Sequence, residues 1–220
     1  KTEASFLWAD NNQTDNFSKR IFYVLPFTAS INAMYNRLVK DLGSDELVGI
    51  SHGKASYFIY KSVESGDYDE SNLETKRIQN LTKKIYRPYK ILTPFQLIKF
   101  FFGVKGFEMG LSELTNSLLI LDEIHAYDAR VTCLLLESLK ILKSKFGVDI
   151  FIMSATLPSF LKNLFSKELD ISNFISLDSK ELDSFTRHKV NIINNCIENC
   201  CDKILNDINS GKKVLIVCNT

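Results

Sequence analysis

Two adjacent carboxylates, Asp122 and Glu123, directly follow the apolar run Leu118 to Leu121. A short continuous apolar run predicts a strand that is covered on both faces. The end of a parallel strand lies at the carboxyl edge of its sheet, where open α/β folds bind their ligands. Since successive side chains point to different sides, one carboxylate could hold Mg²⁺, directly or through water, while the other accepts a proton from an attacking water. This arrangement is typical of an NTPase; the alternative is a strand-to-loop turn with two solvated acids.

A lysine and a threonine, Lys1 and Thr2, precede an apolar helical pattern that includes Phe6 and Ala9. In a phosphate-binding loop, the lysine ammonium reaches the β and γ phosphates and the adjacent hydroxyl ligates Mg²⁺ at the amino end of a helix. The glycines of such a loop do not occur in this sequence, so an exposed terminus is the alternative. The pair gains weight from Asp122, because a threonine in this role needs an acidic partner for Mg²⁺.

Two hydroxyl residues, Ser154 and Thr156, follow another apolar run at residues 150–153. At the same edge of a sheet, their hydroxyls could hydrogen-bond to the acidic pair and to a neighbouring domain, as a relay between sites. The alternative is that they cap the helix that starts near Pro158. Because a D-E-x-H string and an S-A-T string both follow apolar strands here, coincidence is the weaker explanation.

A parallel sheet is needed to bring these residues together, and the hydrophobic pattern predicts one. Apolar runs of strand length alternate with helical patterns, which is typical of βα units in an α/β fold. Glycines at the ends of two helical patterns, Gly43 and Gly147, are typical helix terminators. The predicted strands are 21–25, 47–51, 90–93, 117–122 and 149–154, and the clearest predicted helices are 30–42 and 129–146.

The length of 220 residues suits one large domain and the beginning of another. We predict a first domain over residues 1–183, with an insertion at 54–88 marked by an acidic segment and then a basic one. A second α/β domain would begin at 184–220, with strands at 188–193 and 213–218 and a helix near 195–209. Hydrophobic residues make up 45% and charged residues 24%, which argues against disorder.

The five cysteines are an odd number and lie mostly within apolar patterns, as expected of reduced thiols in a cytoplasmic protein. The cluster of Cys196, Cys200 and Cys201 fits helix packing better than a metal site, since a second cysteine pair or an adjacent histidine is lacking. No segment is long and apolar enough for a membrane span. The net charge of +1 gives no argument for nucleic-acid binding from bulk charge.

Five segments resemble, in chain order, successive motifs of superfamily 2 DExH helicases: residues 1–4, 23–27, 93–96, 122–127 and 154–158. The strings LLILDEIHAYD and MSATLP are most similar to the CRISPR-associated helicase of type I interference systems, which is coupled to an HD nuclease. The resemblance implies a RecA-like parallel sheet of the P-loop NTPase class, with helices on both faces, followed by the start of a second RecA-like domain.

The resemblance also implies ATP and Mg²⁺ as cofactors. Lys1 and Thr2 would bind the nucleotide, Thr2 and Asp122 would hold Mg²⁺, and Glu123 would activate the hydrolytic water, so that Asp122 and Glu123 are the catalytic pair. Three further residues would couple hydrolysis to domain movement: His125, Ser154 and Thr156. For His125, a structural role at the strand end is the alternative.

A path for single-stranded DNA is a further implication of the resemblance. Backbone N–H groups at helix starts and short polar side chains hold phosphates there without reading bases, so such contacts need little net charge. Helix capping is the alternative role for the same residues. The implied residues are Pro26, Phe27, Thr28, Thr93 and Gln96.

The function implied is an ATP-dependent DNA translocase of CRISPR interference, working in the cytoplasm with a Cascade-type effector complex and an HD nuclease domain, in cis or in trans. None of the three histidines, at 52, 125 and 188, is followed by an aspartate, so no nuclease activity is expected of this chain. The alternatives are a DExH RNA helicase and a non-hydrolysing nucleotide switch or binding module; Glu123 argues against the latter. These 220 residues alone are expected to bind ATP weakly and to hydrolyse it negligibly.

Overall fold

The structure is a computed structural model that describes residues 1–14, 18–55, 75–77, 87–176, 181, 184 and 190–217. The chain divides into two compact units, Lys1–Asn173 and Phe174–Thr220. Most of the insertion predicted at residues 54–88 lies outside the described residues. The two predicted domains, 1–183 and 184–220, stay a prediction.

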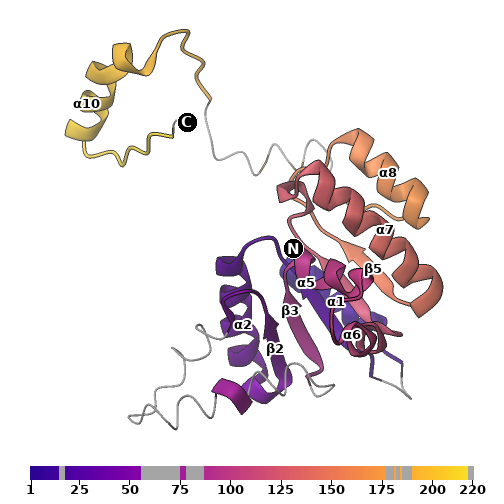
Figure 1. Cartoon of the computed structure of the whole chain (residues 1–220). Coiled ribbons are helices and arrows are strands. Elements are labelled where there is room, and N and C mark those ends of the chain that lie inside the picture. Colours follow the sequence, from indigo (N-terminus) through magenta and orange to yellow (C-terminus); the bar gives the residue numbers. More distant parts are fainter. Residues whose placement is uncertain are drawn as a thin grey trace, which may run out of the picture. The chain divides into compact units, whose positions relative to one another are not determined.

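The first unit is built on a sheet of five parallel strands (Figure 1). The strand order is β2-β3-β1-β4-β5, so β1 lies at the centre between β3 and β4. All five predicted strands are confirmed to within two residues. Their bounds are β1 (Ile21–Val24), β2 (Val48–Ser51), β3 (Tyr89–Leu92), β4 (Leu118–Leu121) and β5 (Asp149–Ile152).

Helices cover both faces of the sheet, as predicted. Because side chains alternate along a strand, Phe22 and Leu119 pack on one face, against α5, α6, α7 and α8, whereas Tyr23 and Ile120 pack on the other, against α1 and α2. The helices are α1 (Thr2–Asn11), α2 (Thr28–Leu42), α5 (Pro94–Ile98), α6 (Phe107–Leu114), α7 (Ala129–Phe146) and α8 (Ser159–Leu169), with 3₁₀ turns η1 (Asp45–Leu47), η2 (Lys99–Phe102) and η3 (Ile124–Ala126).

Two helices end where the sequence predicts. Gly43 and Gly147 follow α2 and α7 with φ of 68° and 62°, a left-handed conformation that glycine adopts without steric cost. Helix α2 begins at Thr28, two residues before its predicted start, because the apolar period begins only at Ile31, inside the helix. The core on both faces holds the strand ends in place.

The second unit contains η4 (Ile197–Cys200) and α10 (Cys201–Asn209), which lie within the predicted helix 195–209. The strands predicted at 188–193 and 213–218 are wrong for the described residues 190–193 and 213–217, which form no strand. Val190 and Leu215 are 82% and 86% exposed. An apolar run becomes a strand only when a neighbouring strand takes its backbone hydrogen bonds, and the described part of this unit offers none. No helix in the described ranges has the length and apolar character of a membrane span.

Candidate functional site

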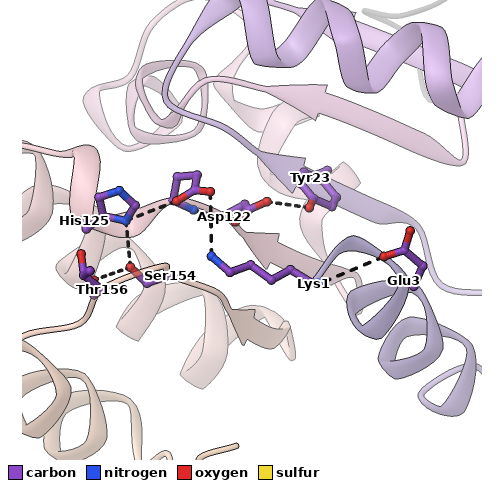
Figure 2. A network of polar contacts seen from close by, with 8 residues as sticks. Lys1, Glu3, Tyr23, Asp122, His125, Ser154 and Thr156 are labelled. Atoms are coloured by element: carbon purple, nitrogen blue, oxygen red, sulfur yellow. Dashed lines mark hydrogen bonds and ion pairs between the residues drawn. The ribbon is translucent and has the colours of Figure 1, made fainter. Parts of the chain in front are cut away.

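Two hydrogen bonds fix the carboxylate of Asp122 at the end of β4 (Figure 2). Its Oδ1 accepts the backbone N–H of Glu123 at 2.8 Å, and its Oδ2 accepts the hydroxyl of Tyr23, on the neighbouring strand β1, at 2.9 Å. Asp122 is only 7% exposed. Since burying a carboxylate costs free energy unless its oxygens are paired, these two donors stabilise it at this position.

The backbone turns sharply at Glu123, whose φ of 53° lies in the left-handed region. For a residue other than glycine this conformation costs on the order of 1–3 kcal/mol, and it persists where surrounding contacts hold it. The turn separates Glu123 from Asp122: the side chain is 37% exposed, with Lys1 Nζ at 4.0 Å from Oε1 and His125 Nδ1 at 3.3 Å from Oε2. An accessible carboxylate at this place can accept a proton from a bound water.

Helix α1 brings Lys1 and Thr2 to the same edge. Lys1 directly precedes the first turn, whose backbone N–H groups and positive dipole end favour anions. The hydroxyls of Thr2 and Ser5 lie close enough to the Tyr23 hydroxyl to lower its pKa, and that hydroxyl donates to Asp122. Lys1 Nζ thus lies 4.0 Å from Glu123 Oε1. Thr2 lies beside the phenol that donates to Asp122.

The donor set around Asp122 fits a magnesium ion. A carboxylate has about four lone-pair sites, of which two are occupied here, so two remain. The described ranges hold no group of three or more His, Cys, Asp or Glu that would cage a metal. Mg²⁺ typically binds one or two protein oxygens and completes its shell with waters and substrate phosphates. The hydroxyl of Thr2 and the carboxylate of Asp122 suit that pattern.

His125, Ser154 and Thr156 form a chain of polar contacts from η3 to the loop after β5 (Figure 2). Ser154 Oγ donates to the Thr156 carbonyl at 2.7 Å and lies 3.0 Å from His125 Nδ1. Because serine has no second proton, the hydrogen-bond network assigns the hydrogen to Nδ1, which donates to Ser154. Thr156 takes part through its backbone carbonyl. The capping alternative is wrong, since α8 follows Pro158 without a side-chain cap.

Two tyrosines, Tyr23 and Tyr127, flank the acidic pair, and neither has a role predicted from the sequence. Burial raises the pKa of Tyr23, the charge of Asp122 and the hydrogen bond to it add to the rise, and the hydroxyls at the start of α1 oppose it. Burial also raises the pKa of Tyr127, with smaller contributions from Asp122 and Glu123. The Tyr127 hydroxyl is buried and has no hydrogen-bond partner within the described chain. Both phenols are protonated at neutral pH.

The residues predicted for the nucleic-acid path divide into exposed and buried ones. Phe27 is 58% exposed, and Thr28 begins α2, whose first turn has neither a side-chain cap nor an acidic residue. Thr93 is 9% exposed, and its Oγ1 accepts the backbone N–H of Gln96 at 3.4 Å. The Gln96 side chain accepts from Lys99. The capping alternative thus holds for Thr93, whereas Phe27 and Thr28 are open to a ligand.

Two Pro-Phe pairs occupy equivalent places on neighbouring strands. The last residues of β1 and β3 pair with each other, and Pro26-Phe27 and Pro94-Phe95 each follow at the second and third positions. Phe95 is 62% exposed, close to the value for Phe27. Exposed aromatic rings at such an edge offer faces on which nucleic-acid bases stack. Phe95 was missed from the sequence because its equivalence to Phe27 depends on which strands are neighbours.

Comparison with known proteins gives consistent matches. The model of the DEAD/DEAH box helicase family matches residues 1–164. A protein named as a CRISPR-associated nuclease/helicase Cas3, from Methanocaldococcus jannaschii, is 35% identical over 165 residues, which are 74% of this chain and 22% of the relative. A second Cas3, from Methanothermobacter thermautotrophicus, is 26% identical over 237 residues, which are 100% of this chain and 27% of the relative. The chain therefore spans about a quarter of the length of these relatives.

The fold has a counterpart among solved structures. The crystal structure of T. fusca Cas3-ATP superimposes with a TM-score of 0.57 at 21% identity, covering 76% of this chain and 18% of that one. This likeness confirms the predicted RecA-like α/β fold.

Proposed function

The chain belongs to the DEAD/DEAH box helicase family, and on that basis we propose that it is an ATP-hydrolysing motor domain that moves along single-stranded DNA. Its sheet edge would bind ATP with Mg²⁺ on the side of β4 and single-stranded DNA on the side of β1 and β3. The observation that carries the proposal is the position of Glu123, accessible and held between Lys1 and His125 beside the buried Asp122.

In the proposed reaction, Lys1 contacts the β and γ phosphates. A water attacks the γ phosphorus in line, the bond from that phosphorus to the oxygen bridging the β phosphate breaks, and ADP leaves. Glu123 accepts the proton that this water loses. Thr2 and Asp122 would hold Mg²⁺, which neutralises charge on the phosphates when it is bound. The rigid hydrogen bonds of Asp122 keep that side of the site fixed while Glu123, more exposed, meets the water.

Coupling to movement would run through His125. Its Nδ1–H faces Glu123 Oε2 at 3.3 Å and Ser154 Oγ at 3.0 Å. When Glu123 accepts a proton, its carboxyl group loses its negative charge and attracts the His125 N–H less. The hydrogen bond from His125 to Ser154 then strengthens. Ser154 in turn donates to the Thr156 carbonyl. The loop that holds these two residues would pass the altered hydrogen bonding to the second RecA-like domain, whose beginning we propose at residues 184–220.

The nucleic-acid side would follow a single strand across the starts of α2 and α5. The uncapped first turn of α2 supplies backbone N–H groups for phosphates, and the exposed phenylalanine beside it supplies an aromatic face. The residues proposed to line this path remain Pro26, Phe27, Thr28, Thr93 and Gln96.

The relatives are named as CRISPR-associated nuclease/helicases. We propose that this chain also works in a CRISPR system. The motor would act in the cytoplasm in CRISPR interference, with a Cascade-type effector complex and an HD nuclease domain, in cis or in trans. We propose no nuclease role for any residue of this chain.

The test is Glu123→Gln in the intact protein, with Glu137→Gln, on an exposed face of α7, as the matched control. Because a general base contributes about 10²–10⁴-fold, we expect hydrolysis stimulated by single-stranded DNA to fall at least about 100-fold while ATP binding is retained. Phosphate release and the binding of a fluorescent ATP analogue measure the two effects. Unchanged hydrolysis would refute the role of Glu123, and stronger stimulation by single-stranded RNA than by DNA would refute the DNA track.

A further inference from the structure

The hydroxyl of Tyr23 reaches the acidic pair from inside the sheet. Tyr23 belongs to the central strand β1 and is 1% exposed, yet its hydroxyl donates to Asp122 Oδ2 at 2.9 Å. In the register of β1 and β4, Tyr23 lies opposite Ile120, two residues before Asp122. Those two residues span about 6.6 Å of strand, so only a long side chain that carries a donor at its tip bridges the gap. Serine or threonine at this place would be too short.

The hydroxyl has no packing role of its own. The Tyr23 ring lies in an apolar cluster that includes Ile31 and Met34, and the ring of Phe6 has its centroid 6.0 Å away. A phenylalanine would fill that space equally well. The extra oxygen costs free energy to bury unless it is hydrogen-bonded, so its contribution lies in the contact with Asp122.

The same hydroxyl lies near the other predicted ligand residue. Thr2 and Ser5, in the first turn of α1, are close enough to it to lower the pKa of Tyr23. The phenol oxygen therefore lies between the start of α1 and the end of β4, where it donates to Asp122. These are the two places from which Thr2 and Asp122 would hold Mg²⁺.

We propose that Tyr23 is a positioning residue of the nucleotide site, which orients the Asp122 carboxylate toward Mg²⁺ and fixes its place relative to Thr2. This inference rests on the proposed function, because it assumes that Asp122 and Thr2 bind a magnesium nucleotide. With Oδ2 committed to Tyr23 and Oδ1 to the Glu123 N–H, the carboxylate cannot rotate. Without the phenol, Asp122 Oδ2 loses its hydrogen-bond donor and the carboxylate can rotate. Metal binding must then restrict that rotation, which lowers the affinity.

The experiment compares Tyr23→Phe with Tyr35→Phe in the intact protein. Tyr35 is 7% exposed in the same apolar cluster, on α2, so its variant also removes a buried phenol oxygen but not one beside Asp122. Two quantities are measured: the Mg²⁺ concentration for half-maximal ATP hydrolysis, and the affinity for Mn²⁺ with ATP present, by electron paramagnetic resonance. Outer-shell partners of metal ligands typically contribute 10–100-fold, so we expect Tyr23→Phe to weaken both by about tenfold and Tyr35→Phe by less than about twofold.

Three readouts separate positioning from general damage. For Tyr23→Phe, the KM for ATP at saturating Mg²⁺ and the circular dichroism spectrum of the folded protein should match those of Tyr35→Phe. In an Asp122→Asn background, Tyr23→Phe should change Mn²⁺ affinity no further, because it acts through that carboxylate. The inference is overturned if the two tyrosine variants have equal effects. It is also overturned if Tyr23→Phe still lowers Mn²⁺ affinity about tenfold in the Asp122→Asn background. If the intact protein hydrolyses no ATP, the proposed function fails instead, and the Mn²⁺ titration still decides the role of Tyr23.

Discussion

The carboxyl edge of the sheet has two unlike halves. On the side of β4 and β5, polar side chains hold one another: His125 Nδ1 lies 3.3 Å from Glu123 and 3.0 Å from Ser154. On the side of β1 and β3, Phe27 and Phe95 are 58% and 62% exposed. The first half is joined by side-chain contacts, whereas the second presents exposed aromatic rings.

The two halves also differ in charge. Asp122 and Glu123 end β4, whereas residues 25–28 and 93–96, which follow β1 and β3, contain no charged residue. Hydrolysis requires groups held in a fixed geometry around the reacting phosphate. Movement along a strand requires contacts that are sequence-tolerant and can be released, such as stacking on aromatic faces and backbone N–H contacts to phosphates. Under the proposed function, one sheet edge would meet these two requirements at different strands.

The strongest way to break this comparison is to remove the exposed rings. Since base stacking contributes about 1–3 kcal/mol, we expect Phe27→Ala and Phe95→Ala each to weaken single-stranded DNA binding by about tenfold. Hydrolysis in the absence of DNA should stay within about twofold of normal. Fluorescence anisotropy with an oligonucleotide measures the first effect, and phosphate release measures the second.

Phe160→Ala is the matched control, because Phe160 on α8 is also exposed, at 69%, but lies outside the β1 and β3 half. An abasic oligonucleotide should bind the normal protein and both variants alike, because no base is left to stack. If Phe27→Ala lowers DNA-free hydrolysis as much as DNA binding, the two halves are not separable.

A smaller effect tests the proposed coupling through the hydrogen bond between His125 and Ser154. Ser154→Ala removes the acceptor of the His125 N–H, and one such hydrogen bond contributes about 0.5–1.5 kcal/mol. We therefore expect DNA-stimulated hydrolysis to fall about fivefold, while DNA-free hydrolysis and DNA affinity change less than about twofold. The control, Ser144→Ala, removes a hydroxyl that donates only to its own helix, at Lys140. An equal loss with and without DNA would place Ser154 in the hydrolytic machinery rather than in the link.

The strands and the acidic pair were predictable because each strand is a short, largely apolar segment, and a carboxylate that follows such a segment lies at the sheet edge. The order of the strands was not predictable, because the five runs look alike in the sequence. The contact between Tyr23 and Asp122 depends on β1 lying beside β4, and the matching of Phe27 and Phe95 depends on β1 lying beside β3. Both were therefore missed.

The runs at 190–193 and 213–217 show the limit of the same rule. Their apolar composition resembles that of β4, yet they form no strand among the described residues. An apolar pattern reports which residues can be buried, but only a neighbouring strand supplies the backbone partners. Local pattern thus predicted β4 correctly and these segments wrongly.

His52, after β2, extends the β1 and β3 half of the edge and is buried, in contrast to the exposed His125. It is 7% exposed. Its Nδ1 accepts the backbone N–H of Lys54 at 3.2 Å, so Nε2 carries the hydrogen and donates to Asn32 at 3.0 Å. Protonation of the ring would leave Nδ1 as a donor facing another donor, which breaks the contact with Lys54.

The smallest expected effect follows from this neutral ring. Burial lowers the pKa of His52 below its ordinary 6.5, so the folded protein binds fewer protons than the unfolded chain as the pH falls past that value. The stability that the neutral ring contributes is complete above about pH 6.5 and is lost as the pH falls through the folded pKa. We expect the unfolding temperature to fall from about pH 7 to pH 5, and His52→Gln to flatten that fall more than His125→Gln does. An unchanged slope in His52→Gln would assign the acid sensitivity to other groups and leave this half of the edge without a titrating residue.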